Sequence, residues 1–169
     1  MAGYLKLYYP DLSPPQIKEF KQRFRSLEIC IDNKTEEALY FSDSYFFHSK
    51  MFKTNEYPRE VAARSGSVYF LVNTTFLRGV SGGWKFKVVE QDLYLYIGFS
   101  NPIFGSYKTF VSLKNCGTLS AKWPYKELKD GSMKTDKCDK YIVDVTFTDP
   151  HYSSFQRIHC RIRYNEFNV

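Results

Sequence analysis

The stretch from Phe155 to Tyr164 reads FQRIHCRIRY and carries the clearest secondary-structure signal in the chain. Apolar and aromatic side chains alternate there with basic ones. One side holds Ile158, Cys160, Ile162 and Tyr164, and the other holds Arg157, His159, Arg161 and Arg163. Strict alternation over this length predicts a strand of an antiparallel sheet, with one buried face and one wet face.

Seven further segments have strand character and are bounded by turn residues. They span residues 27–31, 39–47, 67–72, 83–89, 93–99, 107–113 and 141–147. The chain also contains 14 Tyr and 15 Phe, residues that favour pleated, half-buried surfaces over helices. Because the chain has no internal repeat and no linker, we expect one all-β domain over residues 1–169, either a sandwich or a barrel.

A short basic amphipathic helix is expected over residues 13–25. Ser13 can cap it, Pro14 suits the first helical position, and Gln16 completes a capping box. Four apolar side chains follow at helical spacing and share one face: Ile17, Phe20, Phe24 and Leu27. That face either packs against the sheet or lies in a membrane interface. A second short helix is expected at residues 123–129.

The charge and the motifs exclude several classes of function. With 24 Lys and Arg against 18 Asp and Glu, the net charge of +6 would attract anionic partners such as acidic lipid headgroups. No RNP-like, KH or helix-turn-helix pattern accompanies this charge, so we expect no nucleic-acid partner. An excess of this size is also common on proteins that have no anionic ligand.

We expect neither catalysis nor a metal or other cofactor. The three histidines belong to no G-x-S-x-G or H-E-x-x-H pattern, and the chain has no phosphate-binding G-x-x-x-x-G-K-[ST] loop. The four cysteines never form a C-x-x-C pair, which disfavours a zinc site. They could form two disulfides or none: Cys30, Cys116, Cys138 and Cys160.

Residues 93–113 join two strands through a loop that carries several large apolar side chains. These include Pro102, Ile103, Phe104 and Tyr107. Such a loop exposes its apolar residues unless something covers them, and exposed aromatic patches usually mark an interface. Tyr and Trp rings suit the boundary between membrane and water in particular. The alternative is that these side chains fold back beneath the sheets.

Four stretches, in order along the chain, resemble the actinoporin family of sea-anemone cytolysins and their actinoporin-like relatives. They are ICIDNKT at 29–35, GVSGGWKF at 79–86, LYLYIGFSNP at 93–102 and YKEL at 125–128. The corner Phe99-Ser100-Asn101-Pro102 is the specific part of the match. The resemblance implies a β-sandwich flanked by two short α-helices. It also implies a pore-forming cytolysin that binds phosphocholine headgroups, especially of sphingomyelin, inserts an N-terminal helix and oligomerises.

Carried over by position, the resemblance implies three sets of site residues. The headgroup set is Ser49, Ser81, Ser100, Pro102, Tyr107 and Tyr125. The membrane-interface set is Ile103, Phe104, Phe110 and Trp123, and the inserting helix contributes Ile17, Phe20, Phe24 and Leu27. Aromatic faces would hold a quaternary ammonium by cation–π attraction, and hydroxyls would bond the phosphate. The chain departs from the family at Lys129 and Asp130, where the family has a Tyr-Tyr pair.

Aromatic platforms serve sugars as well as choline, so a carbohydrate-binding, lectin-like module on the same sandwich fold is the alternative function. The sequence shows neither a signal peptide nor a transmembrane helix. We expect a soluble protein that is secreted or released, and the resemblance implies that it then associates with lipid membranes and oligomerises there. A helix over residues 13–25 would be about 20 Å long, against a hydrocarbon core of about 30 Å, which favours surface binding over pore formation.

Overall fold

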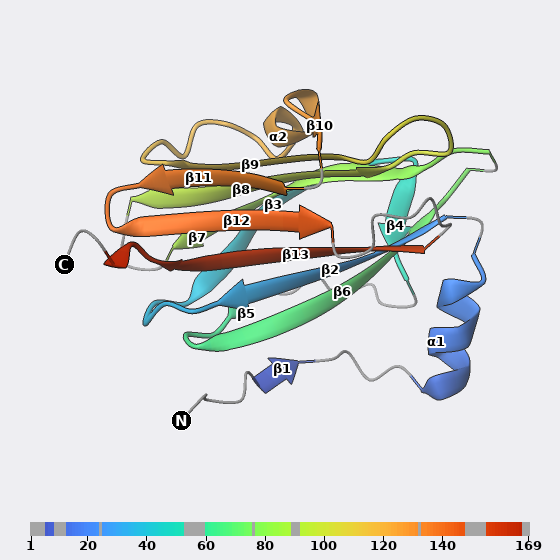
Figure 1. The fold of residues 1–169 in the computed structure, drawn as a ribbon, viewed down its shortest axis with the longest axis horizontal. Coiled ribbons are helices and arrows are strands. Elements are labelled where there is room, and N and C mark those ends of the chain that lie inside the picture. Colours follow the sequence, from blue (N-terminus) through green and yellow to red (C-terminus); the bar gives the residue numbers. More distant parts are fainter. Residues whose placement is uncertain are drawn as a thin grey trace.

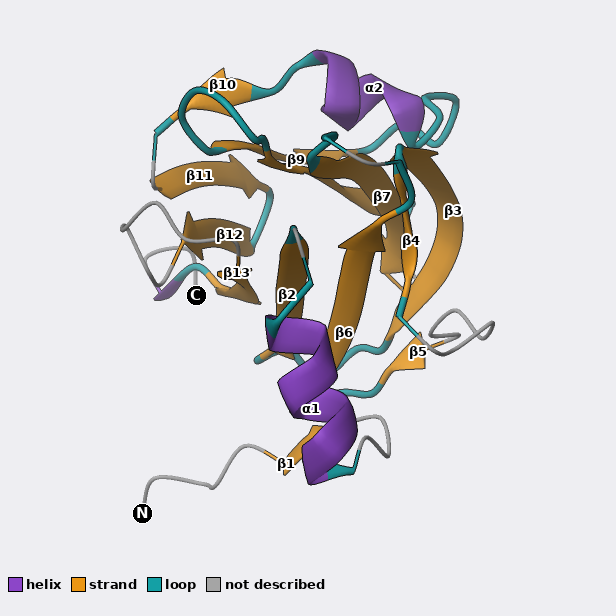
Figure 2. Cartoon of the chain, turned by 90° about the vertical axis from the view of Figure 1, so that its right-hand side faces the viewer, coloured by secondary structure: helices purple, strands orange, loops and turns teal. Residues whose placement is uncertain are grey.

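In the computed structural model, two β-sheets pack face to face as a sandwich, and a short helix lies against the outside of each sheet (Figures 1 and 2). The structure describes residues 6–8, 13–23, 25–52, 60–75, 77–88, 92–131, 133–147 and 155–166. The architecture is the β-sandwich with two flanking helices that the resemblance implied.

The helices of the described residues are α1 (Pro14–Lys21) and α2 (Lys122–Lys126). The strands, in chain order, are β1 (Lys6–Tyr8), β2 (Ser26–Asn33), β3 (Leu39–Phe47), β4 (Ser49–Met51), β5 (Glu60–Val61), β6 (Ser65–Asn73), β7 (Val80–Val88), β8 (Leu93–Asn101), β9 (Lys108–Lys114), β10 (Lys129–Asp130), β11 (Met133–Cys138), β12 (Tyr141–Phe147) and β13 (Phe155–Tyr164). One sheet has the order β1-β6-β2-β13-β12-β11, with β4 also paired to β6. The other has the order β10-β9-β8-β7-β3-β5.

All eight strands predicted from the sequence are present, and the strands that were missed are short or polar. β1, β4, β5 and β10 have only two or three residues each. β11 reads MKTDKC and has no alternating apolar face. The pairing of β13 also differs from the prediction, because this strand is antiparallel to β12 but parallel to β2. It is therefore a central strand of a mixed sheet.

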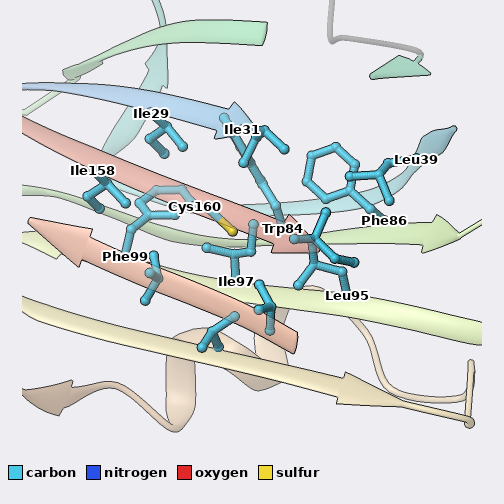
Figure 3. Packing of buried hydrophobic residues seen from close by; sticks show 14 of the residues in the cluster. Ile29, Ile31, Leu39, Trp84, Phe86, Leu95, Ile97, Phe99, Ile158 and Cys160 are labelled. Atoms are coloured by element: carbon cyan, nitrogen blue, oxygen red, sulfur yellow. The ribbon is translucent and has the colours of Figure 1, made fainter. Parts of the chain in front are cut away.

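The core lies between the two sheets and is built mainly from alternate side chains of the longer strands (Figure 3). Trp84 is fully buried, and its ring centroid lies 5.3 Å from those of Tyr69 and Phe99 in edge-on contacts. β13 contributes its predicted apolar face, including Ile158 and Cys160. All four cysteines are free thiols, so burial of apolar surface stabilises this fold without disulfides.

Helix α1 begins where the sequence predicted and ends earlier. The Ser13 backbone N–H donates a hydrogen bond to Gln16 Oε1 at 2.8 Å, as the capping box requires. The helix ends at Lys21, and Leu27 lies in β2, fully buried in the core. The expected helix to residue 25 with Leu27 on its face is therefore wrong, because pairing of β2 with both β6 and β13 outweighs local helical spacing. Phe24 lies outside the described residues.

The apolar face of α1 packs against the outside of the first sheet. Phe20 is fully buried there, and its ring centroid lies 5.3 Å from Phe52, 4.9 Å from Phe70 and 5.7 Å from Phe155. Ile17 is half-buried. In this state the helix has the packing role that the sequence left open, and Phe20 is its main anchor.

Candidate functional site

Helix α2 lies directly on the outside of the second sheet because two glycines make room for it. A Cβ atom at Gly83 would come within 3.0 Å of the Ala121 backbone oxygen, and one at Gly98 within 3.0 Å of the Pro124 backbone oxygen. Any larger residue at either position would push the helix away from β7 and β8. Gly83 and Gly98 thus form the seat for α2, whereas a Cβ atom at Gly82 would meet the Tyr45 backbone oxygen and the Phe99 ring instead.

Aromatic side chains of β8 and β9 also hold the same helix on the sheet. The Trp123 ring contacts Tyr96 and Phe110, with centroids 5.2 and 5.1 Å apart, and Lys114 Nζ lies 5.9 Å from the Trp123 ring. Both Trp123 and Phe110 were expected at a membrane interface, but both are half-buried against one another. The structure gives them a positioning role: they hold α2 on the sheet.

A pocket of about 560 Å³ opens beside α2, at the end of the sandwich where β8 and β9 are joined. It lies between α2, the ends of β3 and β8, the start of β7, and the loops before β7 and after β8. Six of the predicted site residues line it: Ser81, Ser100, Pro102, Ile103, Phe104 and Tyr125. Eight more lining residues were not predicted: Phe47, His48, Leu77, Arg78, Gly79, Lys108, Lys126 and Leu128.

Ser49 and Tyr107, both predicted headgroup residues, are not among the residues that line the pocket. Ser49 is buried, and its hydroxyl donates to the Ser81 backbone oxygen at 2.7 Å, which ties β4 to β7 behind the pocket. Tyr107 packs its ring against Phe147 with centroids 4.8 Å apart. Its hydroxyl accepts a hydrogen bond from Gln156 Nε2 at 2.9 Å, and this buried amide draws the tyrosine toward the core.

Among the described residues, three basic side chains line the pocket and no acidic side chain does. We call Arg78, Lys108 and Lys126 the pocket cations. None of them forms an ion pair or a side-chain hydrogen bond with any residue that the structure describes. At a separation of about 8 Å and an effective dielectric constant of about 20, one unit charge attracts an anion by about 2 kcal/mol. The pocket therefore has the electrostatics of an anion site.

Two hydroxyls in the pocket can add hydrogen bonds to such an anion. Within the described chain, the hydroxyls of Ser100 and Tyr125 have no hydrogen-bond partner. Burial, and secondarily the neighbouring Tyr45, raise the pKa of Tyr125 above its ordinary value, so its hydroxyl stays protonated and can donate. Ser81 differs, because its hydroxyl already donates to the Phe47 backbone oxygen at 3.3 Å.

Exposed apolar side chains surround the pocket. Phe104 is 87% exposed, Leu77 57% and Phe47 40%. In the part of the chain that the structure describes, only Tyr40 and Met133 are other large apolar side chains with comparable exposure. Leu77 also has a positive φ of 59°, which is uncommon for a residue with a side chain. Three of these five exposed side chains therefore gather around one pocket, and such a patch usually marks an interaction surface.

The loop after β8, which carries Pro102, Ile103 and Phe104 and which we call the pocket loop, is hydrogen-bonded to the segment that follows α1. Arg25 Nη2 donates to the Ile103 backbone oxygen at 3.2 Å, and Asn101 Nδ2 donates to the Ser26 backbone oxygen at 3.1 Å. The loops beside the pocket and α1 lie at the same end of the molecule, at the right in Figure 1. A surface that contacts the pocket would therefore also come near α1.

Sequence reasoning missed the pocket cations because each comes from a different segment of the chain. Arg78 follows an apolar loop residue, Leu77, in the same pattern that singled out Ile103 and Phe104. That signal could have identified the loop before β7. Lys108 and Lys126 carried no comparable signal, since isolated lysines usually lie on solvated surfaces.

No family model and no curated protein sequence matches this chain. Among solved structures, the crystal structure of the lipid binding protein Nakanori is similar, with a TM-score of 0.75. The match covers 88% of this chain and 75% of that chain, at 10% sequence identity. At this identity the likeness establishes the fold: this chain has the β-sandwich fold that the lipid binding protein Nakanori also has.

Proposed function

We propose that this protein binds the surface of lipid membranes, with a headgroup phosphate in the pocket and the surrounding apolar side chains in the interface. The observation that supports this most directly is the combination of pocket cations that have no acidic partner among the described residues with Phe104 and Leu77 exposed around them. Cations and hydroxyls suit a phosphate, and exposed apolar rings suit the boundary where headgroups meet acyl chains. The similar structure is that of a protein described as lipid binding, which agrees with this class of ligand.

Phosphocholine of sphingomyelin is the headgroup that the resemblance to actinoporins implies, and pore formation is the further step it implies. A pore would require α1 to leave its seat, because Phe20 is buried against the sheet. With 8 residues, α1 is about 12 Å long. Among the helices of the described residues, none has the length and apolar character needed to cross a membrane. Surface binding requires no such rearrangement, so it is the function that we propose first.

The test is sedimentation with vesicles of phosphatidylcholine, with and without sphingomyelin, scored together with dye leakage. We expect the protein to sediment with vesicles. Replacing Phe104 by Ser should weaken binding about tenfold, since a buried Phe side chain contributes about 1.5–3 kcal/mol. Tyr40→Ser is the matched control, because Tyr40 is 44% exposed at the other end of β3 from Phe47. This control should bind as the unmodified protein does.

Two outcomes would contradict the proposal. Equal weakening by Phe104→Ser and Tyr40→Ser would show that the pocket loop is not the contact surface. Absence of binding to every vesicle composition, combined with binding to a glycan array, would favour the lectin-like alternative. Leakage in addition to binding would support the pore-forming form of the proposal.

A further inference from the structure

We infer that the pocket selects a lipid headgroup with net negative charge, in preference to zwitterionic phosphocholine. This inference rests on the proposed function and names the lipid class for the same site. The headgroups that fit are those of phosphatidic acid, with a terminal phosphate, or of phosphatidylserine. Both headgroups carry net negative charge: phosphatidic acid has no ammonium, and phosphatidylserine has a carboxylate that offsets its primary ammonium.

The charge of the pocket is the first argument. Arg78 comes from the loop before β7, Lys108 from the start of β9 and Lys126 from α2, so three separate elements each bring a cation to one concavity. The described residues that line the pocket include no Asp or Glu. A phosphate dianion would be attracted by all three cations, whereas a choline in the same space would be repelled by all three.

The aromatic groups of the pocket are the second argument. A choline site needs open ring faces, and cation–π attraction is the main force that would hold the ammonium there. The Tyr125 ring is already in contact with Tyr45 and Phe47, at centroid distances of 5.1 and 5.5 Å. Lys129 and Asp130, at the positions of the family's Tyr-Tyr pair, form β10 and do not line the pocket. The aromatic cage that would favour choline is therefore reduced.

The uncharged donors are the third argument. Ser100 is buried to 9% exposure in β8, and among the described residues its hydroxyl has no hydrogen-bond partner. The protonated Tyr125 hydroxyl is likewise available. An anionic phosphate has enough acceptor oxygens to use both donors together with the pocket cations. The pocket thus offers both the charge and the hydrogen bonds that such a headgroup needs.

The experiment compares three vesicle compositions at 150 mM salt: phosphatidylcholine with sphingomyelin, and phosphatidylcholine with 20% of either phosphatidylserine or phosphatidic acid. We expect at least tenfold tighter binding to the anionic vesicles. The double variant Lys108→Gln/Lys126→Gln should abolish most of this preference. The double variant Lys87→Gln/Lys137→Gln removes the same charge from exposed lysines that do not line the pocket, and should reduce the preference less than threefold.

Ser100→Ala tests the hydrogen-bond donors of the pocket separately from its charge. It leaves the charge of the protein unchanged, and it should weaken binding to phosphatidic acid vesicles about threefold to tenfold. Equal affinity for zwitterionic and anionic vesicles would overturn the inference while leaving the proposed function in place. Equal losses in the two double lysine variants would overturn it as well, because the preference would then come from the overall charge.

Two further measurements distinguish failure of this inference from failure of the proposed function, and a lipid headgroup from a soluble phosphate ester. Absence of binding to all three vesicle types would overturn the proposed function itself. Glycerol phosphate at millimolar concentration should compete with anionic vesicles, which would support a phosphate site. Binding of glycerol phosphate by calorimetry without any binding to vesicles would assign the pocket to a soluble phosphate ester and would overturn the lipid class.

Discussion

The basic side chains of β13 and those of the pocket have different surroundings. On β13, the parallel pairing with β2 places Arg157 beside Glu28 and Arg161 beside Asp32, at nitrogen–oxygen distances of 2.9 and 3.0 Å. The three pocket cations have no carboxylate partner in the described part of the chain. Both regions contribute equally to a count of basic residues. Only the second has charge left to bind a ligand, so pairing, and not the number of cations, distinguishes the two.

This difference also bears on nucleic-acid binding, which the basic face of β13 could have suggested. Arg163 lies 3.7 Å from Asp144, and His159 lies 3.5 Å from Asp32, so this face carries acidic partners along its length. Carboxylates within the same ladder reduce its attraction for a phosphate backbone. The ion pairs instead join β13 to its two neighbouring strands.

The largest expected effect comes from neutralising Asp32, the β2 carboxylate that pairs with the basic face of β13. The Asp32 side chain is only 1% exposed and has Arg161, His159 and Lys34 within 3.0, 3.5 and 3.5 Å. Asp32→Asn should lower the free energy of unfolding by about 2–3 kcal/mol, because it leaves neighbouring cations uncompensated beside a buried site. Urea unfolding measures this change, with Lys87→Gln as the control. A loss below about 0.5 kcal/mol would show that the ladder does not stabilise the sheet.

A second effect of the same origin is the loss of stability in acid. Burial alone would raise the pKa of Asp32, but hydrogen bonds from His159 and Arg161 and the charge of Lys34 outweigh it and hold the pKa below its ordinary value. A lowered folded-state pKa contributes stability that is complete above the unfolded-state pKa of about 4 and disappears as the pH falls through the folded-state value. Unfolding measured from pH 6 to pH 2 should therefore show a shallower decline for Asp32→Asn than for the unmodified protein.

Single substitutions of one cation from each region should affect different properties. Arg161→Gln should lower the free energy of unfolding by about 1 kcal/mol, since its side chain is half-exposed, and should leave vesicle binding unchanged. Lys126→Gln should change stability by less than about 0.5 kcal/mol and weaken binding to anionic vesicles about fivefold. Vesicle sedimentation and thermal unfolding of both variants measure the two properties. The comparison fails if Arg161→Gln weakens binding as much as Lys126→Gln does.

The smallest expected effect separates two tyrosines that were both predicted to bind a headgroup. Tyr107→Phe removes the acceptor for Gln156 Nε2 and should lower the free energy of unfolding by about 0.5–1 kcal/mol, with vesicle binding unchanged. Tyr125→Phe removes a hydroxyl without a hydrogen-bond partner in the described chain, so it should leave stability unchanged. Binding of the Tyr125→Phe variant to vesicles should weaken about threefold. Weakened binding by Tyr107→Phe alone would restore the assignment made from the sequence.

Local patterns were enough to predict the strands but not which strands pair. Alternation of apolar and polar residues identified β13 and seven other strands, because a strand's side-chain period is a property of neighbouring residues. The same alternation is compatible with parallel and antiparallel partners. The parallel pair of β13 with β2 depends on contacts between segments far apart in the chain. The end of α1 was mispredicted for the same reason, since pairing of β2 takes Leu27 into the core.

The sequence by itself determined an all-β class and part of the candidate site, because strand periodicity, turn residues and an apolar loop at Phe104 are encoded by adjacent residues. The choice of a sandwich over a barrel came from the family resemblance. The tertiary structure alone decided which side chains meet. It gathered Arg78, Lys108 and Lys126 from three elements and turned Tyr107 toward Gln156. It also paired the arginines of β13 with acidic residues of β2 and β12. The positive charge of the pocket, which has no acidic partner among the described residues, depends on these distances between residues remote in sequence, because Coulomb interactions follow distance in space.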